Sequence, residues 1–283
     1  MLRDSRDRSN SATGWRRTYS TSVSAPTNDP APRAGAAPRP LSARSVVLSL
    51  LLGADAPELP ARELVRLADR FGVGGSTARA ALSRMASAGD LRRTEGGYRL
   101  GARLLDRQRR QDEAVRPRTR AWDGDWELVV VTASGRGPAE RADLRARLTA
   151  LRLAELREGV WLRPANLRRP LPADLARVAE PGRCRPDRPA ADLAALLWPL
   201  DAWADTAREL LGHVGRAGTP AGRLAAFAAV VRHLLADPVL PAPLLPDDWP
   251  GPALREAYTR YRREQPRRPG AGDAPASAAP APA

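Results

Sequence analysis

The stretch LPARELVRLADRFGVGGSTARAALSRMASAGDLRRTEGGYRL, residues 59–100, decides the fold of the first half of the chain. Apolar residues recur at helical spacing in residues 62–68 and again in residues 76–87. Between them, residues 71–75 contain three glycines, which permit the positive-φ backbone of a sharp turn. Residues 91–100 alternate apolar and polar side chains around a Gly-Gly pair, as a β-hairpin does. The order helix, turn, helix and hairpin predicts a winged helix-turn-helix.

The second helix of this pair has two chemically different faces. The apolar residues within 78–85 share one side of a helical wheel, and we expect that side to be buried. The other side is small and hydroxyl-bearing, with Arg79 and Arg84 at its edges. Small residues let a helix enter a major groove about 12 Å wide, where arginine can bind guanine or hold a phosphate. We expect Ser76 or Thr77 to cap this helix by accepting from its first free N–H groups.

These features together predict a DNA-binding surface. The arginines of the hairpin can reach the phosphate backbone, while the second helix reads the bases. One alternative is a small helical domain whose arginines are only solvated, and another is a winged helix used for protein contacts. The joint occurrence of helix, glycine turn, small-faced helix and basic hairpin favours DNA. The predicted contact residues are Ser76, Thr77, Arg79, Ala80, Ser83, Arg84, Arg92, Arg93 and Arg99.

This stretch resembles the PaaX-type transcriptional repressors, which are regulators of phenylacetate catabolism. The closest string is Ala-Arg-x-Ala-Leu-Ser-Arg-Met at residues 78–85. Arg-Ser-x-x-Leu at residues 44–48 and Tyr-Arg-Leu at residues 98–100 are also similar to the family. The resemblance implies a repressor that leaves its operator when it binds an acyl-CoA thioester such as phenylacetyl-CoA.

The resemblance extends beyond the winged helix-turn-helix. Residues 122–126 and 159–162 are similar to strings of the family, and residues 237–250 match its long C-terminal Asp-Pro-x-Leu-Pro…Leu-Leu-Pro-x-Asp-Trp-Pro signature. Two positions depart from it. The family usually has an aromatic residue where this chain has Asp90, and residues 231–236 lack the aromatic string that the family carries there.

The sequence carries a large positive charge. Its formal net charge is +14 over 283 residues, and all of its 46 basic residues are arginine. This charge favours a polyanionic partner, although GC-rich coding is the simpler explanation for the lack of lysine. The excess lies in residues 1–170, whereas residues 171–265 carry equal numbers of arginine and acidic residues. We therefore expect DNA to meet the first part of the chain.

The sequence shows no sign of export or membrane insertion. Cys184 is the one cysteine, so no disulfide can form within the chain. No signal-peptide pattern is present, and the apolar runs fall short of the ~20 residues that span a bilayer. These observations predict a cytoplasmic protein with no membrane partner.

The succession of helices, strands and proline-rich segments predicts an α+β chain of three domains between two disordered tails. The expected boundaries are residues 1–40 for the first tail, 41–115 for the winged helix-turn-helix, 116–190 for a central ferredoxin-like α+β domain, 191–265 for a helical C-terminal domain and 266–283 for the last tail.

Hydrophobic periodicity places the elements within these domains. The central domain is expected to contain a strand at 127–133, a helix at 138–151, a strand at 159–163 and a short segment at 182–185. A polar helix should connect it to the hairpin and end before Pro117. The C-terminal helices are expected at 191–211, 221–235 and 252–263.

No pattern typical of an enzyme stands out. Asp123 and Asp125 precede the first central strand, where ferredoxin-like nucleases hold a metal, so a metal-dependent nuclease is the alternative function. An Asp-Gly turn is the simpler interpretation, because two aspartates give a metal too few ligands. His213 and His233 lack sequence neighbours that would complete a metal site. We expect no catalytic residue, no metal and no cofactor.

Two partners other than DNA are expected. One recognition helix covers only a few base pairs, so a homodimer that reads a palindromic operator is predicted. An acyl-CoA effector, which the resemblance implies, needs cations for its phosphates. Arg163, Arg168 and Arg169 are candidate donors, and a solvated basic face is the alternative interpretation of these arginines.

Overall fold

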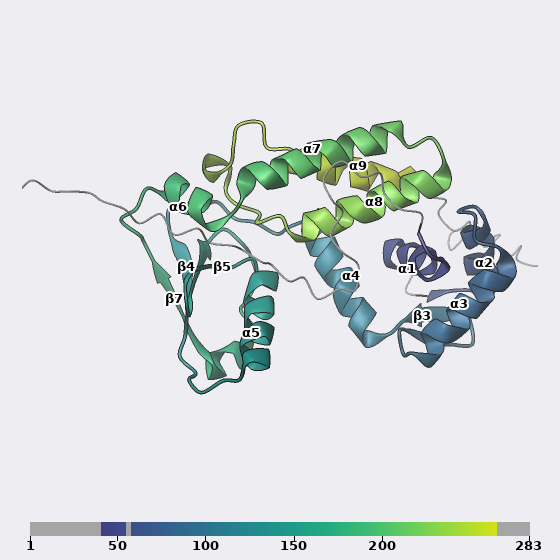
Figure 1. Cartoon of the computed structure of the whole chain (residues 1–283), viewed down its shortest axis with the longest axis horizontal. Coiled ribbons are helices and arrows are strands. Elements are labelled where there is room, and N and C mark those ends of the chain that lie inside the picture. Colours follow the sequence, from purple (N-terminus) through teal and green to yellow (C-terminus); the bar gives the residue numbers. More distant parts are fainter. Residues whose placement is uncertain (1–40, 55–57, 265–283) are drawn as a thin grey trace, which may run out of the picture. The chain divides into compact units, whose positions relative to one another are not determined.

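The computed structural model describes residues 41–54 and 58–264 (Figure 1). The tails expected at 1–40 and 266–283 lie outside the described residues. A helical region with a small sheet comes first, a four-stranded antiparallel sheet follows, and a helical region ends the described chain. The predicted α+β fold class is confirmed.

The amino-terminal region is a winged helix. Its three-stranded antiparallel sheet has the order β1-β3-β2, and Leu64, Leu82 and Leu91 lie in one apolar core beneath it. Strand β1 was not expected from the sequence. The elements are α1 (Ala43–Gly53), β1 (Glu58–Leu59), α2 (Ala61–Asp69), α3 (Gly75–Ser87), β2 (Leu91–Arg93) and β3 (Tyr98–Leu100).

The turn before α3 differs from the expectation in one respect. Gly72 has a φ of +79° and donates its N–H to the Asp69 carbonyl at 2.9 Å, as the predicted glycine turn requires. The N-cap residue, however, is Gly74, and no side chain caps the helix. The predicted capping by Ser76 or Thr77 is wrong, because the Gly74 carbonyl already accepts from Ala78 N at 2.9 Å and closes the first turn earlier.

The central region has the strand order β5-β6-β4-β7 with every neighbouring pair antiparallel. This is the ferredoxin-like order, with the second helix reduced to a 3₁₀ turn. The first strand ends at Val131, two residues before the expected end, and the expected 182–185 segment lies, except for Arg185, in a longer strand that ends at Cys184. The elements are β4 (Trp126–Val131), α5 (Pro138–Ala150), β5 (Ala154–Arg157), β6 (Val160–Pro164), η1 (Ala173–Arg177) and β7 (Ala179–Cys184).

Alternation along the strands gives the central sheet two covered faces. Val129 and Trp161 are cross-strand partners and pack with Leu148 of α5 in one apolar cluster. Trp126 and Leu162 belong to a separate cluster with residues of α6 (Ala190–Leu197). Alternate residues of a strand lie on the same face, so Glu127 is on the same face of the sheet as Val129, which is the face that α5 covers.

The single helix expected at 191–211 is wrong. Helix α6 ends at Leu197, and α7 (Leu200–Arg216) begins after Pro199. Trp198 has φ −131° and ψ 137°, because a following proline disfavours helical backbone. The remaining elements are α4 (Ala102–Val115), α8 (Pro220–Leu235), η2 (Ala242–Leu244) and α9 (Gly251–Glu264).

Helix α4 joins the wing to the helical region. It ends at Val115, as expected before Pro117, and its Ala114 packs in the same apolar cluster as Phe227 and Leu254. The Ala114 carbonyl accepts from Arg255 Nε at 3.1 Å. In the part of the chain that the structure describes, no helix is long and apolar enough to cross a membrane.

Candidate nucleic-acid interface

Helix α3 presents the predicted contact face to solvent. Its apolar side, formed by residues including Ala78 and Leu82, is buried, as the helical wheel predicts. All of the predicted helix residues lie on the opposite side and are exposed: Ser76, Thr77, Arg79, Ala80, Ser83 and Arg84. The sequence therefore identified the outward face of this helix correctly.

The charge on this face is not neutralised within the protein. Helix α3 contains no acidic residue. Neither Arg79 nor Arg84 has a hydrogen-bond or ion-pair partner among the described residues. Both guanidinium groups are thus available to an external acceptor, which can be a base edge or a phosphate.

The wing adds three more exposed arginines. In the hairpin, Leu91 and Leu100 point into the core, while Arg92 and Arg99 lie on the outer face. Arg93 donates from Nε to Tyr98 Oη at 3.2 Å, and its guanidinium lies 5.8 Å from the centre of the Tyr98 ring. Tyr98 therefore orients Arg93, whereas Arg92 and Arg99 have no partner within residues 41–54 and 58–264.

The tip of the wing depends on Gly97. Its φ is +150°, and a Cβ placed there would lie 2.7 Å from Pro60 Cα and closer still to the Leu59 carbonyl. Gly97 also exchanges hydrogen bonds with Thr94, donating to Oγ1 at 3.0 Å and accepting from Thr94 N at 3.0 Å. Only glycine allows β1 to pass this close to the hairpin.

Asp90 is a structural residue of this region that the sequence did not identify. Its side chain is buried and accepts from Arg44 at 2.7 Å and from Arg103 at 2.5 Å. Burial by itself raises the pKa of Asp90, but the hydrogen bonds and charges of the two arginines outweigh it and lower the pKa below its ordinary value. Asp90 thereby ties α1, the start of the wing and α4 together.

A signal for this role was present in the sequence. An acidic residue between the end of an apolar helix and an apolar strand requires a cationic partner if it is buried. The partners could not be named in advance, because Arg44 lies 46 positions before Asp90.

The aspartates of the nuclease alternative are engaged in a turn. Asp123 accepts from Asp125 N at 3.2 Å. Asp125 forms ion pairs with Arg185 at 2.5 Å and Arg183 at 3.6 Å. The hydrogen bond from Arg185 lowers the pKa of Asp125. The hydrogen bond between the two residues and the ion pairs of Asp125 favour the Asp-Gly turn. The described residues contain no group of three potential His, Cys, Asp or Glu metal ligands.

The three candidate phosphate-binding arginines of the central domain differ in exposure. Arg168 is exposed and Arg169 is partly buried, but Arg163 is fully buried. Burial lowers the pKa of Arg163 to about 9. Arg163 donates to Asn166 Oδ1 at 2.8 Å and to the Val239 carbonyl at 3.3 Å. It is therefore neither part of a solvated basic face nor available to a phosphate.

Among the described residues, neither histidine belongs to a group of three potential His, Cys, Asp or Glu metal ligands. His233 stacks on Trp203 with ring centres 4.3 Å apart and bonds through Nε2 to the Trp203 carbonyl at 2.9 Å. Burial lowers the pKa of His233 despite that hydrogen bond. Trp203 in turn stacks on Trp249 at 4.4 Å, so this histidine takes part in an aromatic stack within the helical region.

Comparison with known proteins assigns a relative to each region. The PaaX-like protein family model matches residues 42–104, the PaaX protein central Cas2-like domain matches residues 119–179, and the PaaX-like protein C-terminal domain matches residues 200–270. Among solved structures, an uncharacterized protein from Mycobacterium tuberculosis is 51% identical with a TM-score of 0.69, over 78% of this chain and 94% of that chain. No curated protein gives a significant match.

Proposed function

Because the chain belongs to the PaaX family of transcriptional regulators, we propose that it is a sequence-specific DNA-binding repressor. The observation that carries the proposal is the outer face of α3, which has small side chains, no acidic residue and two arginines without a partner among the described residues. A solvated helix would gain from i to i+4 ion pairs, and α3 has none. A helix that enters a polyanionic groove gains from the lack of acids.

Each predicted contact has a distinct role in this proposal. Arg79 and Arg84 bind base edges or the phosphates at the rim of the major groove, while Ser76 and Ser83 let the helix approach closely. The wing arginines hold the backbone and contribute affinity without sequence preference. The protein binds as a homodimer, since one α3 reads a half-site and a second copy reads the other half about 10 base pairs, or a multiple of that, away.

A small effector, such as an aromatic acyl-CoA, releases the repressor from its operator in this proposal. The support for it is family membership together with the basic central domain. A hundredfold loss of operator affinity requires the effector to bind the DNA-free state about 2.7 kcal/mol more tightly than the bound state. Thermal-shift and operator-release measurements with free acids and their CoA thioesters test this part separately from DNA binding.

The DNA-binding proposal is tested with fragments from upstream of the protein's own operon. Fluorescence anisotropy on these fragments and on random DNA, across a salt series, should show a clear preference for one fragment. Arg79→Ala and Arg84→Ala should each weaken specific binding by about 1–3 kcal/mol. Arg216→Ala is the matched control. Arg216 lies in α7, outside the winged helix, and is an exposed helical arginine that has no partner among the described residues. Equal affinity for all DNA at every salt concentration would refute the proposal.

A further inference from the structure

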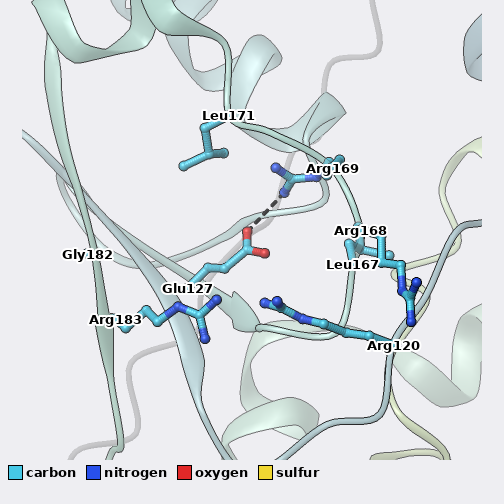
Figure 2. Close-up of a pocket in the computed structure, with 8 residues that line it drawn as sticks. All are labelled: Arg120, Glu127, Leu167, Arg168, Arg169, Leu171, Gly182 and Arg183. Atoms are coloured by element: carbon cyan, nitrogen blue, oxygen red, sulfur yellow. Dashed lines mark hydrogen bonds and ion pairs between the residues drawn. The ribbon is translucent and has the colours of Figure 1, made fainter.

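The central region contains an arginine-lined pocket of about 580 Å³ that the proposed DNA contact does not use (Figure 2). Four of its lining residues are arginines, and Glu127 is its one acidic lining residue. Leu167 and Leu171 supply apolar wall. The arginines are Arg120, Arg168, Arg169 and Arg183.

The strand register explains why these charges meet. Glu127 of β4 is the Cα partner of Arg183 in β7 and of Arg163 in β6, so the three side chains project from the same face of the sheet. Helix α5 covers this face farther along, at Val129. Residues 167–171 follow β6 where a ferredoxin-like fold would place its second helix, and they form one side of the pocket instead.

The guanidinium of Arg169 is incompletely satisfied. It donates from Nη2 to Glu127 Oε2 at 3.2 Å and to the Leu151 carbonyl at 2.6 Å. Its Nε and Nη1 are buried and have no acceptor in the described structure. Burial lowers the pKa of Arg169 despite the opposing charge of Glu127. An additional negative charge nearby would therefore stabilise this cation.

The other arginines leave donors free toward the pocket. Arg120 uses Nε for the Ala165 carbonyl at 2.8 Å, and its terminal nitrogens have no described partner. Arg183 lies 3.6 Å from Asp125, which is already bonded to Arg185 at 2.5 Å. In Figure 2 the guanidinium groups of Arg120 and Arg183 point toward each other below Glu127. The pocket therefore has four arginines against the single carboxylate of Glu127, which is paired with Arg169.

A phosphate monoester fits these features best. Guanidinium forks bind phosphate oxygens in pairs, and a phosphate has enough terminal oxygens for several arginines. The pocket is larger than a phosphate alone, and Leu171 offers an apolar surface beside the charged groups. We propose that this pocket binds a small phosphorylated organic molecule, with Arg120 and Arg183 on the phosphate and the organic part against Leu171. The proposal does not rest on DNA binding by the winged helix.

The test uses the full chain with inorganic phosphate and phenyl phosphate as probes. Their dissociation constants are measured by ³¹P NMR, and melting temperatures are compared with chloride at equal ionic strength. We expect phosphate to raise the melting temperature and phenyl phosphate to bind about tenfold more tightly than phosphate, because of its added apolar area. No phosphate-specific rise and no measurable binding of either probe would overturn the proposal.

The variants separate the pocket from general charge effects. R120Q/R183Q should weaken phenyl phosphate binding at least about tenfold, whereas R157Q/R188Q removes the same charge from exposed arginines outside the pocket and should change it less than about twofold. R120K/R183K keeps the positive charges but loses the paired N–H donors of the guanidinium groups. Its affinity for phenyl phosphate should lie between those of the other two variants. If R120Q/R183Q and R157Q/R188Q weakened phenyl phosphate binding equally, the proposal would be overturned. The proposal would also be overturned if R120Q/R183Q lost affinity for the operator but bound phenyl phosphate normally. The pocket arginines would then contact the DNA backbone.

Discussion

Arg92 of β2 and Arg99 of β3 lie directly opposite each other in the antiparallel ladder of the wing. Both are exposed, and neither has an acceptor in the described part of the chain. Like charges in directly opposed positions destabilise a pair of strands. A DNA phosphate placed over this pair would replace the repulsion with attraction.

Arg99→Gln tests this relationship. The variant should leave the free energy of unfolding within about 0.5 kcal/mol of the wild type, because it removes both the repulsion from Arg92 and the attraction of Glu58, which is the Cα partner of Arg99 on β1. It should weaken binding to all DNA sequences alike and reduce the slope of log affinity against log salt by about 1. Urea unfolding and a salt titration measure the two effects. Arg157→Gln, at an exposed strand position of the central sheet, is the control, and an unchanged salt slope in the Arg99 variant would exclude Arg99 as a phosphate contact.

Gly97→Ala should destabilise the winged helix. The new methyl group would meet the Leu59 carbonyl and Pro60 Cα, and backbone atoms cannot move aside cheaply. We expect a loss of about 1–3 kcal/mol in the free energy of unfolding. Gly96→Ala is the matched control, since its methyl group would meet only the flexible carboxylate of Glu58. If denaturant unfolding showed equal losses of stability in Gly97→Ala and Gly96→Ala, the close approach of Gly97 to β1 would not be the cause of the destabilisation.

Asp90→Asn should destabilise the protein in a pH-dependent way. At pH 7 the loss of charged hydrogen bonds to Arg44 and Arg103 should cost about 1–2 kcal/mol, because both arginines are partly solvated. The folded-state pKa of Asp90 is lowered, so its stabilising charge is fully present above the unfolded value of about 3.9 and is lost as pH falls through the folded value. The difference between wild type and variant should therefore shrink below about pH 4. A difference that stays constant from pH 7 to pH 3 would contradict the ion-pair role.

Arg163→Met should lower the free energy of unfolding by about 2–4 kcal/mol, since several buried acceptors lose their donor. These acceptors include Asn166 Oδ1 and the carbonyls of Pro164 and Val239. Arg168→Met changes a neighbouring exposed arginine and should have almost no effect. Thermal unfolding of both variants makes the comparison, and equal melting temperatures would mean that the Arg163 network adds nothing to stability.

The sequence was sufficient where local periodicity decides the structure. The sequence patterns predicted the helices flanking the Gly72 turn, the hairpin around Gly97 and the strand β4. The break before α7 was missed when one helix was expected at 191–211, although Pro199 disfavours helical backbone at Trp198 and was a local signal for it. The exposed face of α3 followed from the same periodicity.

The remaining features depend on partners far away in the chain. Strand β1 has two residues and exists only through its pairing with β3. Strand β5 is a mostly solvated edge without the β-branched residues that mark a strand. Arg163 resembles a surface charge in sequence, yet its acceptors include a carbonyl 76 positions later. No local pattern encodes such contacts.

Helix α4 has a mechanical consequence. It begins directly after the wing and ends where Ala114 is bonded to Arg255, which itself holds Asp237 at 2.6 Å. Its 14 residues form a rod of about 21 Å, so a tilt of about 5° at one end displaces the other by about 2 Å. The Arg255–Asp237 pair therefore holds the end of α4 that lies opposite the wing. If a molecule bound at this end of α4 and changed the affinity of the wing for its target, thermodynamic reciprocity would require the target to change the affinity for that molecule by the same free energy.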